Sequence, residues 1–173
     1  MDTSNFTEMK VHRLVLDPNT NSPIVILQAD TGVLLPIWIG IFEAHAIAMK
    51  MEDIESPRPM THDLLSNTIA AVNGMVNRVE VVDLVDNTYF ARVYFQVKDE
   101  SFSVDSRPSD AIALALRAPS PIFVANHVLE KSKLDPEAEA EATSELEEGV
   151  DEEERWNRIL KNFTPPGAKD KMN

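Results

Sequence analysis

Reactive side chains gather at three places in this chain where a helix is expected to begin. They carry carboxylate, imidazole, guanidinium and hydroxyl groups and are Glu43, His62, Asp63, Asp105, Arg107, Ser109 and Asp110. The first turn of a helix has unpaired backbone N–H groups and the positive end of the helix dipole, so anions bind well there. If the fold brings the three places together, these acids, one histidine and one arginine share a pocket.

The chemistry that such a pocket favours is metal-assisted hydrolysis of a phosphodiester. Carboxylate oxygens and imidazole nitrogens are ligands for Mg²⁺ or Mn²⁺. We expect Asp63, Asp105 and Asp110 to ligate or orient such an ion. The ion would polarise the phosphate and lower the pKa of its bound water.

The other members of the set fit the remaining roles in this reaction. Glu43 or His62 is the candidate general base. Arg107 offers a fork of N–H donors that matches the oxygens of a phosphate. A structural interpretation is also open, because an acid in a first turn stabilises a helix by about 0.3–1 kcal/mol without any chemistry. Arg107, between two acids, would then belong to an ion-pair network that fixes its loop.

Composition excludes several classes of protein. The chain has 173 residues and no cysteine, which excludes disulfides, thiolate metal sites and a cysteine nucleophile. The net charge is −13, and acids exceed bases both before and after residue 135. Such a chain lacks the basic excess of a tight nucleic-acid binder, so nucleic acid is expected only as a transient substrate. Short apolar runs and the lack of a signal-peptide pattern indicate a cytoplasmic protein without a membrane span.

The hydrophobic pattern predicts an α+β fold with a mixed, largely antiparallel sheet and three main helices. Alternating and β-branched runs predict strands at Met9–Asp17, Pro23–Ala29, Val33–Gly40, Val76–Val85, Tyr89–Val97, Ser101–Val104 and Ile122–Val124. The first three strands form an antiparallel meander in the simplest arrangement. Pro36 places the third strand at an edge or gives it an irregularity.

Helical spacing predicts three main helices and one short final one. They cover Ile41–Ile54, the segment from an N-cap at Thr61 to Asn73, the segment that begins at Pro108, and Asn126–Lys133. The helix after Pro108 is apolar on nearly every face and is therefore expected to be buried. The apolar stripe of the second helix is expected to face the core and consists of Leu64, Leu65, Thr68, Ile69 and Val72.

The last part of the chain, residues 135–173, differs from the rest in composition. Residues 1–134 are expected to form the α+β domain, and residues 135–173 an acidic, partly helical or flexible C-terminal extension. Within the extension, Arg155–Phe163 has the spacing of a small amphipathic helix. It is a candidate for contact with the domain or with a protein partner.

Three runs of this sequence resemble the bifunctional nuclease domain family. They are L-P-I-W-I-G-I-F-E-A-H-A-I-A at 35–48, R-P-M-T-H-D-L-L at 58–65 and V-D-S-R-P-S-D-A-I-A-L-A-L-R at 104–117. The resemblance covers roughly residues 9–133. It implies a compact α+β domain, a homo-oligomer, and hydrolysis of RNA, DNA or both. Bacterial relatives often carry a short acidic C-terminal extension such as the one seen here.

The resemblance also implies which residues belong to the site. The catalytic candidates are Glu43, His62, Asp63, Asp105 and Asp110, and the substrate-binding candidates are Arg107, Ser109 and Arg58. His45 stands where the family more often has glutamine, so it is a poor candidate for an essential role. The leading hypothesis is a metal-assisted nuclease. The alternative is a non-catalytic oligomeric module that binds a small ligand or a protein.

Overall fold

A seven-stranded sheet organises the computed structural model, which describes residues 4–17 and 19–132. The strands are β1 (Phe6–Leu16), β2 (Pro23–Ala29), β3 (Leu34–Trp38), β4 (Gly74–Val85), β5 (Thr88–Val97), β6 (Glu100–Ser106) and β7 (Ile122–Ala125). The helices are α1 (Ile41–Met51), α2 (Thr61–Ala71), α3 (Pro108–Arg117) and α4 (Asn126–Ser132). This confirms the α+β class. The predicted acidic extension lies outside the described residues.

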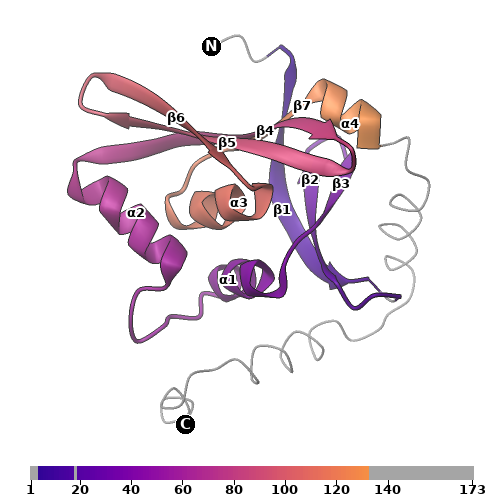
Figure 1. Cartoon of the computed structure of the whole chain (residues 1–173), viewed down its shortest axis with the longest axis horizontal. Helices are drawn as coiled ribbons and strands as arrows, with labels where there is room; N and C mark the ends of the chain where they lie inside the picture. The colour runs from indigo at the N-terminus through magenta and orange to yellow at the C-terminus, as the bar shows by residue number, and fades with distance from the viewer. Residues whose placement is uncertain (1–3, 18, 133–173) are drawn as a thin grey trace.

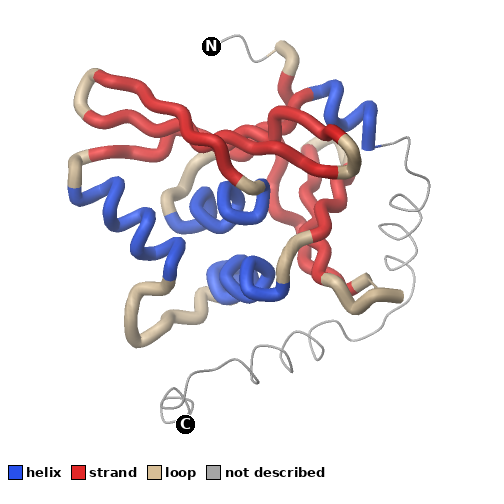
Figure 2. Tube along the Cα trace, viewed as in Figure 1, coloured by secondary structure: helices blue, strands red, loops and turns tan. Residues whose placement is uncertain are grey.

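The strands are arranged in the order β3-β2-β1-β7-β4-β5-β6 (Figures 1 and 2). The pair β4–β7 is parallel, and the other neighbours are antiparallel. The sheet is therefore mixed and largely antiparallel, as predicted. Pro36 lies in β3 at one edge of the sheet, where a residue without an N–H group is tolerated.

Helix α3 forms the centre of the core. It contacts α1 and α2 on one side and β4 and β5 on the other. Figure 1 shows α1, α2 and α3 grouped on one side of the sheet, with α4 on the other. Most residues of α3 are buried, including Ile112 and Leu114, which confirms the prediction for this helix. No helix in the described part of the chain is long and apolar enough to cross a membrane.

Helix α2 differs from the prediction in two ways. Its expected core stripe is largely outside the core, because Leu64 is 61% exposed and Val72 is 51% exposed. The reason is that α2 packs on α3 and the start of β4, and no described element covers its other faces. The N-cap is Met60 rather than Thr61, because the carboxylate of Asp63 accepts the Met60 N–H at 2.8 Å.

Asp83 ties α4 to the sheet and gives a prediction on pH. Its carboxylate accepts hydrogen bonds from Lys131 Nζ and the Leu84 N–H, both at 2.8 Å, and lies 3.2 Å from His127 Nε2. The Lys131 hydrogen bond, followed by that of Leu84, lowers the pKa of Asp83 to about 2. A carboxylate with a lowered pKa stabilises the fold above its unfolded pKa of 3.8, and this contribution is lost as the pH falls through about 2.

The prediction can be checked by urea unfolding of the wild type and Asp83→Asn at pH 6 and pH 3. We expect the difference in unfolding free energy between the two proteins to be larger at pH 6 than at pH 3. An equal difference at the two pH values would contradict the assigned role of this carboxylate.

Candidate active site

Four polar side chains form a continuous chain of contacts where the first turns of α1, α2 and α3 meet. Arg107 Nη2 lies 2.7 Å from Glu43 Oε1, and Arg107 Nε lies 2.7 Å from Asp110 Oδ2. Asp110 Oδ1 is 3.0 Å from His62 Nε2. We call these four residues the Arg107 cluster. The structure therefore brings together one predicted candidate from each of the three helix starts, together with Arg107, the N-cap residue of α3.

Local sequence explains how each residue reaches the cluster. Pro108 begins α3, where its fixed φ and missing N–H suit the first helical position, and this places Arg107 just before the helix and Asp110 in its first turn. Glu43 lies in the first turn of α1, after the N-cap Gly40. A β-carbon on Gly40 would overlap the Glu43 carboxylate. The carboxylate can therefore occupy its present position only because residue 40 is glycine.

Burial within the Arg107 cluster is uneven. The side chains of His62 and Glu43 are 11% and 16% exposed, whereas that of Arg107 is 66% exposed. Nη1 of Arg107 has no hydrogen-bond partner among the described residues. The cluster therefore presents a guanidinium to solvent, and the acids and the histidine are sheltered behind it.

Asp110 is the residue through which the cluster is held together. Burial, the largest single influence, raises the pKa of Asp110, but the hydrogen bonds and charges of Arg107 and His62 outweigh it, so the pKa is lowered. The same contact with Asp110 is the main reason why the pKa of Arg107 is raised. The pairing of Asp110 with Nε2 fixes the orientation of the His62 ring, and Nδ1 is the ring nitrogen that does not contact Asp110.

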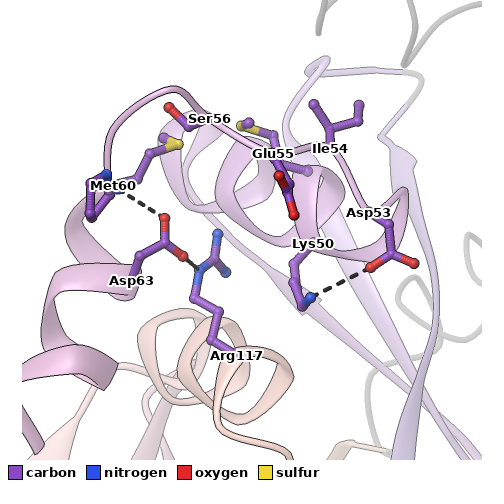
Figure 3. Close-up of a pocket in the computed structure, with 10 residues that line it drawn as sticks. Lys50, Asp53, Ile54, Glu55, Ser56, Met60, Asp63 and Arg117 are labelled. Atoms are coloured by element: carbon purple, nitrogen blue, oxygen red, sulfur yellow. Dashed lines mark hydrogen bonds and ion pairs between the residues drawn. The ribbon is translucent and has the colours of Figure 1, made fainter. Parts of the chain in front are cut away.

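Asp63 is adjacent to His62 in sequence but belongs to a different contact (Figure 3). Its Oδ1 accepts a hydrogen bond of 2.5 Å from Arg117 Nε. Arg117 also donates to the carbonyls of Ala113 and Ala46, both at 3.0 Å, so that it joins α1, α2 and α3. Burial raises the pKa of Asp63, but the Met60 N–H and Arg117 outweigh it, and the pKa is lowered.

Sequence reasoning did not single out Arg117. The available signal was an arginine that ends an otherwise apolar, buried helix, since such a charge needs partners. Its side chain is 7% exposed and forms one wall of a cavity of about 450 Å³ between α1 and α2, with Lys50 and Met60 also lining it (Figure 3). The Asp63–Arg117 pair therefore joins α1, α2 and α3 and lies outside the Arg107 cluster.

The other candidates lie apart from the cluster or at its border. Asp105 is exposed on β6, opposite Arg92 of β5, and Arg58 is exposed between α1 and α2. No contact among the described residues joins either of them to the Arg107 cluster. Ser109 is buried and lines a second cavity, of about 400 Å³, in which Arg107 also takes part.

The predicted metal ligands do not form a preformed metal centre. Asp63 pairs with Arg117, Asp110 pairs with Arg107 and His62, and Asp105 lies on an exposed strand. Within residues 4–17 and 19–132, no three His, Asp or Glu side chains are grouped so that they could hold a metal ion. Carboxylates already paired with arginines do not fit a Mg²⁺ or Mn²⁺ centre, so a role for these ions stays a prediction.

Comparison with known proteins places this chain in a family. Residues 25–137 match the bifunctional nuclease domain, and the chain belongs to that family. An uncharacterized protein of Mycobacterium tuberculosis is 38% identical over 165 residues, which cover 94% of this chain and 98% of that protein. The family predicted from the three sequence runs is confirmed.

The relatives with named activities are plant proteins. Bifunctional nuclease 2 of Arabidopsis thaliana is 32% identical over 108 residues, or 60% of this chain and 33% of the plant protein. Bifunctional nuclease 1 of Oryza sativa subsp. japonica is 28% identical over 105 residues, or 58% of this chain and 32% of that protein. The matched region is thus about a third of each plant protein.

Proposed function

We propose that this protein hydrolyses phosphodiester bonds in RNA, DNA or both, and that the Arg107 cluster is its active site. The observation that carries the proposal is the meeting of Glu43, His62 and Asp110, from three separate helices, at one solvent-exposed guanidinium. Membership of the bifunctional nuclease domain family and the names of the plant relatives support the same reaction class.

Each residue of the cluster has a role that its surroundings suit. The free Nη1 of Arg107 is the donor for a phosphate oxygen. Glu43 and His62 are the candidate general bases, and Asp110 positions His62 through Nε2. With a neutral imidazole the cluster carries a net charge of −1, from two carboxylates and one guanidinium. This charge opposes the approach of a phosphate.

The negative charge of the cluster is the reason to keep divalent-cation dependence as a proposal. Mg²⁺ is often bound by one or two carboxylates together with substrate phosphates rather than by a complete protein cage. Such an ion would supply charge neutralisation at the phosphate.

Chelation tests the proposed metal dependence, and a matched variant tests the site. We expect purified full-length protein to cleave labelled RNA or DNA oligonucleotides with Mg²⁺ or Mn²⁺ present, and to lose at least about tenfold in rate in EDTA. Asp110→Asn is expected to lose activity, and Asp53→Asn is the control, because Asp53 is an exposed acid whose ion pair among the described residues is with Lys50.

The outcomes separate the two parts of the proposal. Full activity in EDTA would exclude dependence on a divalent metal ion, and the proposed nuclease activity would stand. Cleavage by Asp110→Asn at the wild-type rate would exclude the Arg107 cluster as the site. Absence of cleavage by the wild type under all of these conditions would overturn the proposed function.

A second candidate function is a non-catalytic oligomeric module that binds a ligand or a protein. The observation that favours it is the apolar surface of α2, where Leu64, Leu65 and Val72 are exposed. Light scattering on the full chain and on a chain that ends at residue 136 distinguishes the two. If the shorter chain loses assembly and no hydrolysis is found in either protein, the module is favoured.

A further inference from the structure

The cavity beside the Arg107 cluster has the size and the walls of a ligand site. Its volume is about 400 Å³, and its lining includes Trp38, Ile39, Gly40, Tyr89, Arg107 and Ser109. Pockets for small organic ligands measure about 300–1,000 Å³ and combine apolar or aromatic walls with a few polar groups. Here two aromatic side chains share the lining with a guanidinium and a hydroxyl.

Trp38 gives this cavity a stacking surface. It is the last residue of β3, and it is 39% exposed. Its indole Nε1 donates to Asp17 Oδ2 at 3.4 Å, and the hydroxyl of Tyr89, the other aromatic residue, donates to the Pro36 carbonyl at 3.3 Å. The polar atoms of both rings therefore already have partners within the protein. What Trp38 still offers to a ligand is apolar ring surface.

Ser109 adds a hydrogen-bonding group to the wall of the cavity. It is 5% exposed, and no described residue forms a hydrogen bond with its hydroxyl, whose oxygen is accessible from the cavity. A hydroxyl can both donate and accept a hydrogen bond, so a polar atom of a ligand in the cavity can pair with it. The free Nη1 of Arg107 belongs to the same lining, so two polar groups are available to one bound molecule.

We infer that this cavity binds one unpaired base of a single-stranded nucleic acid, stacked on Trp38, with the adjoining phosphate at Arg107 and Ser109. The inference rests on the proposed nuclease function and adds the substrate class to it. Aromatic stacking accepts any base, because every base has a flat π-face. A base within a duplex is already paired and stacked, and it would have to be extruded at a cost of a few kcal/mol before it entered.

The first test uses the fluorescence of Trp38 itself. The chain has two tryptophans, so Trp156→Phe leaves Trp38 as the single tryptophan. The probes are a single-stranded thymidine decamer with phosphorothioate linkages, which resist cleavage, and a duplex of the same length and linkage. We expect the decamer to quench Trp38 and to bind at least about tenfold more tightly than the duplex, because a paired base must first be extruded.

The second test compares variants by fluorescence anisotropy of a labelled decamer. Trp38→Leu is expected to weaken binding about tenfold, which is about 1.4 kcal/mol and within the range for stacking one base. Trp38→Phe keeps a ring and is expected to stay within about threefold of the wild type. The matched control is Phe102→Leu on β6, which removes an aromatic ring that is 41% exposed and lines neither cavity described here.

The results distinguish this inference from the proposed function. Absence of quenching, equal binding of decamer and duplex, or wild-type affinity of Trp38→Leu would each overturn the base pocket, even if the protein cleaves nucleic acid. Binding that depends on Trp38 in a protein without hydrolytic activity would uphold the pocket and overturn the proposed function.

Discussion

Arg117→Met is expected to lower the free energy of unfolding by about 3 kcal/mol, the largest loss of stability that we predict for a single substitution. Arg117 is 7% exposed and donates to Asp63 and to the carbonyls of Ala113 and Ala46. Methionine fills similar space but donates nothing, so a partly sheltered carboxylate and two carbonyls lose their partner at once. Urea unfolding of the full chain measures the loss.

Two further proteins make this first prediction specific. Arg92→Met removes an exposed arginine of β5 whose side chain, among the described residues, donates to the Ser103 hydroxyl, and we expect it to change stability by no more than about 0.5 kcal/mol. In the double variant with Asp63→Asn, the loss should be smaller than the sum of the single losses, because both substitutions break the same contact. Unfolding of Arg117→Met at the wild-type urea concentration would contradict the assigned role.

Arg107→Gln is expected to reduce the rate of nucleic-acid cleavage by about 10²–10³-fold, the largest effect on activity that we predict. The variant loses the positive charge and the donor fork that face solvent in the Arg107 cluster. Its stability should change by no more than about 1 kcal/mol, because the Arg107 side chain is 66% exposed and its ion pairs are screened by water. Initial rates at several substrate concentrations give kcat and KM.

Conservative and matched variants sharpen this second prediction. Arg107→Lys keeps the charge but lacks the planar fork, so we expect it to recover only part of the lost activity. Arg92→Gln removes an exposed arginine outside the cluster and is expected to cleave at the wild-type rate. Wild-type kinetics in Arg107→Gln would show that the phosphate is bound elsewhere.

Sequence patterns predicted the fold well, but they predicted the contacts of single residues less well. The almost wholly apolar run after Pro108 identified α3 as a buried helix, because no face of it suits water. The same reasoning was wrong for α2, whose apolar spacing is real but whose exposed side meets no described element. Periodicity reports which residues share a face; it does not report whether another element covers that face.

The contacts among the candidate site residues were predicted in part, for a related reason. The sequence indicated that Glu43, His62, Arg107 and Asp110 would meet if the three helix starts converged, and they do. His62 and Asp63 are adjacent in sequence, but neighbouring residues on a helix point about 100° apart, so that one joins the Arg107 cluster and the other reaches Arg117. Spacing alone could not assign these partners, because they come from distant segments.

Gly40 shows how one position can constrain the side chains of the Arg107 cluster without constraining the backbone. Its φ of −73° and ψ of 155° are open to any residue, so the chain path does not demand glycine there. The demand comes from Glu43, whose carboxylate fills the volume that a side chain at position 40 would need. A methyl group at position 40 would displace the flexible side chain of Glu43 and would not distort the main chain. A substitution at position 40 can therefore change the position of the negative charge beside Arg107 without changing the fold.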